Sequence, residues 1–225
     1  EHFFAEKVHR QRRQSADRHE LESAVQLIRQ AKKPLVVAGG GVHYSGAITA
    51  LDAWVSRYQL PVGETQAGKG ALPWDHTQNV GTIGVTGGAA ANALAAEADL
   101  IIAVGTRLGD FASGSRAMIN PNAKLLSINV ASFDAVKHKG QALVGDAKLT
   151  LEELITELEG WQPEESWVEQ AAGLRTDWNQ TVDKVTADRG NNLPYDAEVV
   201  GAVNRAAGER DIVVCAAGGL PGELQ

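Results

Sequence analysis

Short, continuous apolar runs alternate with segments of helical periodicity along most of this chain, and this alternation constrains the fold more than any other feature. Runs without polar alternation are typical of strands that are buried on both faces. Strands that alternate with helices predict an α/β fold, a Rossmann-like, doubly wound parallel sheet of five or six strands with helices on both faces. The predicted parallel strands are residues 35–38, 60–62, 100–104, 124–130 and 142–144.

The segments between these runs carry helix signals. Asp17 with Glu20, and Thr150 with Glu153, predict capping boxes at the starts of two helices. Further helices are predicted at residues 48–58, 88–97 and 198–207, together with a long helix that bears Trp167. By contrast, residues 39–41 are expected to form a tight turn, residues 63–87 a long irregular segment, and residues 212–216 a last strand.

Composition excludes several classes of protein. The chain has 225 residues, with 28 acidic and 21 basic side chains and a net charge of −7, so nucleic acid is not expected as a partner. The one cysteine, Cys215, rules out a disulfide framework and fits a cytoplasmic location. No apolar run is long enough to span a membrane. Both ends look cut, which predicts a fragment of a longer protein.

Two glycine-rich loops raise the possibility of nucleotide binding. The first, GGGVHYSG from Gly39 to Gly46, follows a strand as a dinucleotide fingerprint would, but Tyr44 occupies its third glycine position. Glu64 is the one acidic residue near the end of the next strand. The second loop, GETQAGKG, resembles a phosphate-binding loop but ends in Gly70 where Ser or Thr would hold magnesium. A ligand-free tight turn is the alternative interpretation of the first loop.

No catalytic constellation follows from the remaining polar residues. The six histidines are scattered without metal-ligand spacing, so no metal site is predicted. Asp110 and Asp134 are isolated, which favours caps or surface groups. Ser113 and Ser115 lack the glycine context of a nucleophile elbow.

Concatenated motifs nevertheless resemble a known family. The segments KPLVVAGGGV, LPVGETQAGKGALPWDH, ADLIIAVGTRLGDF, KLLSINV and LVGDAKLTLEEL are similar to the central domain of thiamine-diphosphate enzymes of the acetohydroxyacid synthase and pyruvate decarboxylase superfamily. The ending DIVVCAAGGLPGEL resembles the start of the third domain of that superfamily, in the branch that opens a cyclic dione by hydrolysis during myo-inositol catabolism.

The resemblance implies a division of the chain. Residues 1–19 would be a linker from a preceding domain, 20–160 the central domain, 161–194 a linker with a long helix, and 195–225 the truncated start of a diphosphate-binding domain. It also implies a small-molecule cyclic dione as substrate and a homo-oligomer for the full-length protein. A decarboxylase or acetohydroxyacid synthase, and a free-standing nucleotide-binding module, are the alternatives.

The resemblance also implies cofactors. Thiamine diphosphate and Mg²⁺ are expected in the full-length protein, and none in this chain alone. Gly218 and Gly219 match the turn that contacts the diphosphate and are the only site residues carried over. Gly105-Thr106-Arg107 matches a strand end that holds FAD in some members, but Asn129 stands where an acidic residue is often found, so FAD is not expected.

Overall fold

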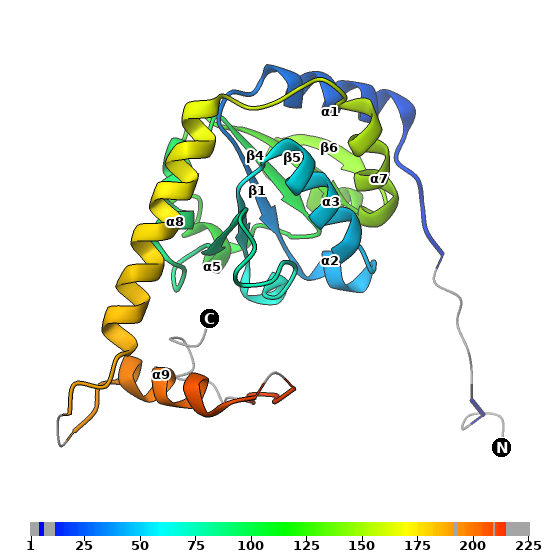
Figure 1. Cartoon of the computed structure of the whole chain (residues 1–225). Helices are drawn as coiled ribbons and strands as arrows, with labels where there is room; N and C mark the ends of the chain where they lie inside the picture. Colours follow the sequence, from blue (N-terminus) through cyan, green and yellow to red (C-terminus); the bar gives the residue numbers. More distant parts are fainter. Residues whose placement is uncertain (1–4, 7–11, 191–192, 209, 215–225) are drawn as a thin grey trace.

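A six-stranded, entirely parallel sheet forms the centre of the protein, with strand order β3-β2-β1-β4-β5-β6 (Figure 1). This computed structural model describes residues 5–6, 12–190, 193–208 and 210–214. The predicted doubly wound α/β class is therefore confirmed. The strands are β1 (Pro34–Ala38), β2 (Val62–Glu64), β3 (Asn79–Thr82), β4 (Leu100–Val104), β5 (Lys124–Asn129) and β6 (Gln141–Val144).

All five predicted strands belong to this sheet, although β2 begins at Val62, the last residue of its predicted run. The sixth strand, β3, lies within the segment that was expected to be irregular, so that expectation is wrong for residues 79–82. Its sequence, NVGT, has a single large apolar residue and includes Gly81 at φ +87°. An edge strand of this composition gives no apolar run to detect.

Helices pack on both faces of the sheet, because successive side chains of each strand point to opposite sides. On one face, Val36 and Ala38 pack in a cluster with α1, α3 and α7; on the other, Leu35 and Val37 pack with α4 and α8. This two-sided burial explains the continuous apolar runs. The helices are α1 (Arg18–Gln30), α2 (Gly40–Tyr44), α3 (Ile48–Tyr58), η2 (Gln66–Gly68, a 3-10 turn), α4 (Ala89–Glu97), α5 (Asp110–Ser113), α6 (Ser132–Val136), α7 (Ala147–Glu157), α8 (Glu165–Thr186) and α9 (Asp196–Ala206).

The helix starts differ from the predicted capping boxes. Asp17 caps α1 by accepting from the backbone N–H groups of His19 and Glu20, but the Glu20 carboxylate instead accepts from the N–H of Val144 at 2.7 Å. That bond ties α1 to the outer strand β6. The α7 cap is Asp146 rather than Thr150, so the second capping box is wrong. The predicted tight turn at 39–41 is also wrong in part, because α2 begins at Gly40.

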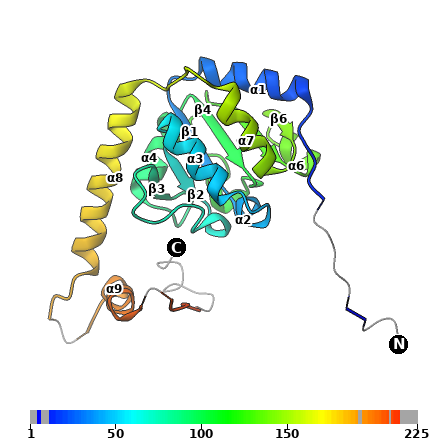
Figure 2. The ribbon, with the colours of Figure 1, turned by 45° about the vertical axis from the view of Figure 1, so that its right-hand side comes forward.

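A helical arm leaves the sheet. α8 is anchored by Trp167, whose indole N–H donates to the carbonyl oxygen of Pro34 at 2.8 Å. Its last turns extend past the sheet and carry α9 (Figure 2). Arg189 donates to the Glu198 carboxylate and Arg205 to the Thr186 carbonyl, which hold α9 against the end of α8. Residues 212–214 have no regular secondary structure, so the predicted last strand is wrong there, and 215–216 lie outside the described residues.

Candidate functional site

The point where the strand order reverses, between β1 and β4, is where open α/β sheets bind their ligands. Two loops meet there at the carboxyl ends of the strands. The first is the glycine run that connects β1 to α2, and the second is the Gly105-Thr106-Arg107 segment after β4. A nucleotide would need backbone N–H groups of the first loop to face an open crevice.

Instead, the two loops contact each other through their backbones. The N–H of Gly39 donates to the Val104 carbonyl and the N–H of Gly41 donates to the Gly105 carbonyl, each at 2.9 Å. A Cβ on Gly41 would lie 2.6 Å from the Cα of Gly105, and one on Gly39 would lie 2.5 Å from the Cβ of Thr106. These glycines are therefore needed for the close contact between the two loops.

The loop after β2 folds around a carboxylate, that of Glu64 at the end of the strand. The Glu64 side chain is 4% exposed and accepts from the N–H of Leu72 at 2.9 Å and of Gly70 at 3.3 Å. Burial raises the pKa of Glu64, and the bonds from these N–H groups and from Asn79 oppose that rise. A phosphate-binding loop aims such N–H groups at a phosphate. Here the carboxylate of Glu64, at the end of β2, occupies two of them, and the next element after Gly70 is the strand β3 instead of an α-helix.

The third segment at this edge follows β5. The side chain of Asn129, the last residue of β5, bonds to the loop that follows β4. Asn129 donates through Nδ2 to the Thr106 carbonyl at 3.3 Å and accepts through Oδ1 from the N–H of Ala131 at 3.0 Å. Both ends of the Asn129 amide are thus engaged by backbone. Arg107 is exposed. Asn129 therefore joins the loops that follow β4 and β5. It does so at the strand end where FAD-binding members of the superfamily would often carry an acidic residue.

The other polar residues singled out from the sequence do not converge on a site. Ser113 is buried, donating to the Gly109 carbonyl and accepting from the N–H of Arg116. Asp110 begins α5, Asp134 lies in the first turn of α6, and Ser115 is exposed. Among the described residues, no three His, Cys, Asp or Glu side chains are grouped to hold a metal ion. In that same part of the chain, no helix combines the length and the apolar character needed to cross a membrane.

One cluster was missed by the sequence analysis. Nε2 of His76 lies 3.1 Å from Oδ1 of Asp52 and 3.2 Å from Oγ of Ser56, which lie one helical turn apart on α3. However, Nδ1 of His76 accepts from the N–H of Gln78 at 3.1 Å, so in the neutral ring the proton belongs on Nε2. Nε2 then has no lone pair to take a proton from Ser56, and the cluster is a hydrogen-bonded clasp between α3 and the loop before β3. His76 lies 20 residues from Ser56 and 24 from Asp52 along the chain, a separation that no sequence pattern reveals.

The two residues expected to contact thiamine diphosphate, Gly218 and Gly219, lie outside the described residues. A groove of about 270 Å³ lies between α1 and α7, away from the strand ends, and is lined by Leu21, Glu22, Val25, Gln26, Arg29 and Glu157. A hollow of about 10 Å³ under the loop after β4 is too small for a cofactor.

Comparison with known proteins gives the family. Residues 21–154 match the model of the thiamine pyrophosphate enzyme central domain. Proteins named 3D-(3,5/4)-trihydroxycyclohexane-1,2-dione hydrolase from Clostridium perfringens and Clostridium tetani are 35% identical over 254 and 249 residues. One from Bacillus cereus is 35% identical over 250 residues. Each alignment covers 100% of this chain and 39% of the relative, so the chain spans about two fifths of their length. The resemblance seen in the motifs is thereby confirmed, and this chain belongs to the thiamine pyrophosphate enzymes, with residues 21–154 as the family's central domain.

Proposed function

We propose that this chain is the central part of a longer thiamine-diphosphate-dependent hydrolase. That enzyme would open the ring of trihydroxycyclohexane-1,2-dione by C–C cleavage, giving a 5-deoxy-glucuronate. The observation that carries the proposal is the 35% identity to proteins named for this substrate over the whole of the present chain, including the segments beyond residue 154. A match restricted to the central domain would support only the broader superfamily.

Within that enzyme, the part described here has a structural role. Support comes from the strand ends, where an α/β domain usually binds its ligand. There Gly41 contacts Gly105 backbone to backbone, and the Glu64 carboxylate occupies the N–H groups of its own loop. A domain whose strand ends are filled by its own residues can act as a rigid spacer between the catalytic domains of the enzyme. Gly218 and Gly219 would contribute to the diphosphate site that other parts of the protein complete.

The decisive experiment is an assay of the full-length gene product with the cyclic dione, thiamine diphosphate and Mg²⁺. Loss of the dione with release of one equivalent of carboxylic acid is the expected result. Pyruvate and other 2-oxo acids serve as competing substrates. Release of CO₂ from pyruvate without turnover of the dione would favour a decarboxylase or acetohydroxyacid synthase instead.

The structural role has its own test on the 225-residue chain. Calorimetry with thiamine diphosphate and Mg²⁺ should give no binding isotherm, because the family resemblance implies that other domains of the full-length protein complete the cofactor site, and no three His, Cys, Asp or Glu side chains among the described residues are grouped to hold a metal ion. A micromolar isotherm would contradict the proposal. The same purified chain should show no flavin absorbance, which tests the prediction that FAD is not bound. Titration with NAD or ATP tests the alternative of a nucleotide-binding module.

Several properties of the full-length protein stay predictions. The cytoplasmic location and the absence of a nucleic-acid partner rest on composition. The domain boundaries, the use of Mg²⁺ and the homo-oligomeric state rest on the family resemblance.

A further inference from the structure

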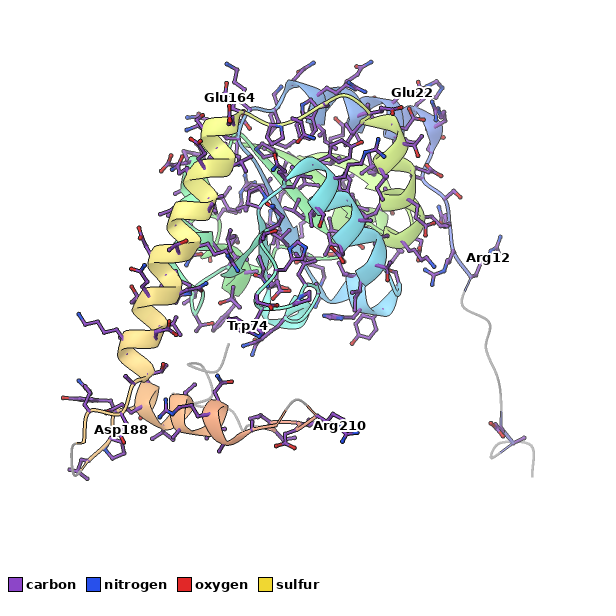
Figure 3. All side chains as sticks on the ribbon, viewed as in Figure 1. Arg12, Glu22, Trp74, Glu164, Asp188 and Arg210 are labelled. Atoms are coloured by element: carbon purple, nitrogen blue, oxygen red, sulfur yellow. The ribbon has the colours of Figure 1, made fainter. Side chains whose placement is uncertain are left out.

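Large apolar side chains are gathered at one edge of the sheet. The carboxyl end of each of five strands is followed by at least one such exposed residue. The residues, in the order of their strands β1 to β5 and with their exposed fractions, are Tyr44 (85%), Trp74 (83%), Val85 (59%), Phe111 (71%), and Val130 (66%) with Phe133 (77%). Parallel strands bring all of these ends to the same edge, and Figure 3 labels Trp74 at its margin.

The opposite edge differs. The segments directly before the six strands, residues 31–33, 59–61, 75–78, 98–99, 120–123 and 137–140, contain no exposed large apolar side chain. A random scatter of surface apolar residues would not respect the direction of the strands. Gathering at one edge marks an interaction surface.

Two of the exposed rings, those of Trp74 and Phe111, lie on segments that hydrogen bonds hold in place. The loop of Trp74 is held on both sides, since Asn79 donates to the Pro73 carbonyl at 3.2 Å and Arg175 donates to the Asp75 carbonyl at 2.8 Å. The short helix α5, which carries Phe111, is tied to the loop after β3, because the N–H of Val85 donates to the Phe111 carbonyl at 2.8 Å. A backbone segment that is already fixed has little conformational entropy to lose when a partner covers it.

The path of the chain indicates which partner this is. α8 runs along the sheet toward the carboxyl ends of the strands, and α9 lies beyond that edge in both ribbon views (Figures 1 and 2). Glu198 and Thr186 fix α9 there through Arg189 and Arg205. After α9, residues 212–214 are three β-branched apolar residues that are 54–89% exposed. The described residues that follow α9 thus lie on the side of the sheet where the exposed rings are (Figures 1 and 2).

We propose that the edge formed by Trp74, Phe111 and Phe133 is the docking surface for the domain that follows α9 in the full-length protein. The inference rests on the proposed function only in requiring that such a domain exists, as it does if the relatives, which are longer than this chain, are a guide to its architecture. It does not depend on the substrate. The domain would present an apolar face that covers the three rings and the strand ends behind them.

Site-directed photo-crosslinking in the full-length protein tests this surface. p-Benzoylphenylalanine is placed at Phe111, and the crosslinked peptides are identified by mass spectrometry. The expected partner is a peptide C-terminal to residue 214 of the same chain. A peptide from the region before residue 1, a product of twice the chain mass, or no crosslink would each overturn the proposal. The same amino acid at Asn122, exposed at the opposite edge, is the matched control and should give no crosslink to that C-terminal part.

Amide hydrogen exchange tests the same surface without a photoreactive group at Phe111. Amides of residues 70–75 and 110–114 should exchange at least about tenfold more slowly in the full-length protein than in the 225-residue chain. The triple variant Trp74→Ser, Phe111→Ser, Phe133→Ser should abolish that difference, while the unfolding midpoint of the 225-residue chain changes little because the three rings are exposed. Equal exchange in both proteins, or a protection that survives the triple variant, would overturn the proposal. Neither readout uses the dione, so a failed activity assay leaves this result interpretable.

Discussion

The carboxylate of Glu64 accepts a 2.9 Å hydrogen bond from the backbone N–H of Leu72, eight residues further along the chain. This bond, with the longer one from Gly70, folds the loop after β2 back onto the strand end. The loop that most resembles a phosphate-binding motif in sequence is thus organised by an internal anion. A bound phosphate would have to displace a buried carboxylate from its donors and would meet its charge.

Replacing Glu64 with Gln should change how stability depends on pH. Burial raises the pKa of Glu64 above its ordinary value of 4.5, so the folded protein binds this proton more readily than the unfolded chain. The free energy of unfolding of the natural protein relative to that of the variant should therefore fall as pH rises from about 4.5 through the raised pKa. Urea unfolding of both proteins from pH 4 to 8 measures this. A relative stability that rises with pH would contradict it.

Gly41→Ala should destabilise the protein by about 1–3 kcal/mol, because the new Cβ meets backbone that cannot rotate away. Its nearest neighbours would be the Cα and carbonyl oxygen of Gly105, at 2.6 and 2.9 Å. Gly173→Ala is the matched control, since Gly173 lies within α8 with nothing within 4 Å of a built Cβ. Alanine there should stabilise by up to about 1 kcal/mol through helix propensity. The two variants should shift the urea midpoint in opposite directions; a tolerated Gly41→Ala would show that the loops are not packed as described.

Trp167→Phe should cost about 2–4 kcal/mol, because it removes ring volume from the core and the donor to the Pro34 carbonyl. That bond joins α8 to β1. Its loss should therefore weaken the attachment of α8 to the sheet and also lower the free energy of unfolding. Trp178→Phe, on the half-buried part of the same helix, should cost about 1 kcal/mol or less. Equal losses in the two variants, measured by urea unfolding, would refute a special role for Trp167.

The strands of the sheet could be predicted where burial on both faces leaves a visible apolar run, as at Val36 and Val37 on opposite faces of β1. β3 could not, because an edge strand with Gly81 lacks that signal. The first residues of the helices were harder to predict than the strands. Thr150 lies in a valid capping pattern, but Asp146, four residues earlier, is the residue whose side chain accepts from a backbone N–H at the start of α7. Asp146 also forms an ion pair with Arg13 at 2.8 Å, and no local pattern reveals a partner 133 residues away.

At the strand ends, the sequence identified the residues but not their partners. The glycines at 39 and 41 could serve a nucleotide or a tight turn, and only their contact with Gly105 distinguishes the two. Likewise, nothing in the sequence indicates that Glu64 binds N–H groups of its own loop or that His76 reaches α3. These are long-range contacts whose spacing follows from the fold and not from any local pattern.

The pairing of Arg189 with Glu198 should make the packing of α9 sensitive to acid. The Arg189 guanidinium, with the N–H of Tyr195, lowers the pKa of Glu198 from 4.5 to about 2. A carboxylate with a lowered pKa stabilises the fold above its ordinary value and loses that contribution as pH falls toward about 2. The carboxyl ¹³C shift of Glu198 should therefore titrate near pH 2 in the natural chain. In Arg189→Ala its pKa should rise toward the ordinary value, because the largest cause of the shift is gone. Lys184→Ala, which removes a positive charge from the last turn of α8, is the control and should leave the titration in place. A Glu198 that titrates near its ordinary value in the natural chain would mean that Arg189 does not hold α9 through this carboxylate.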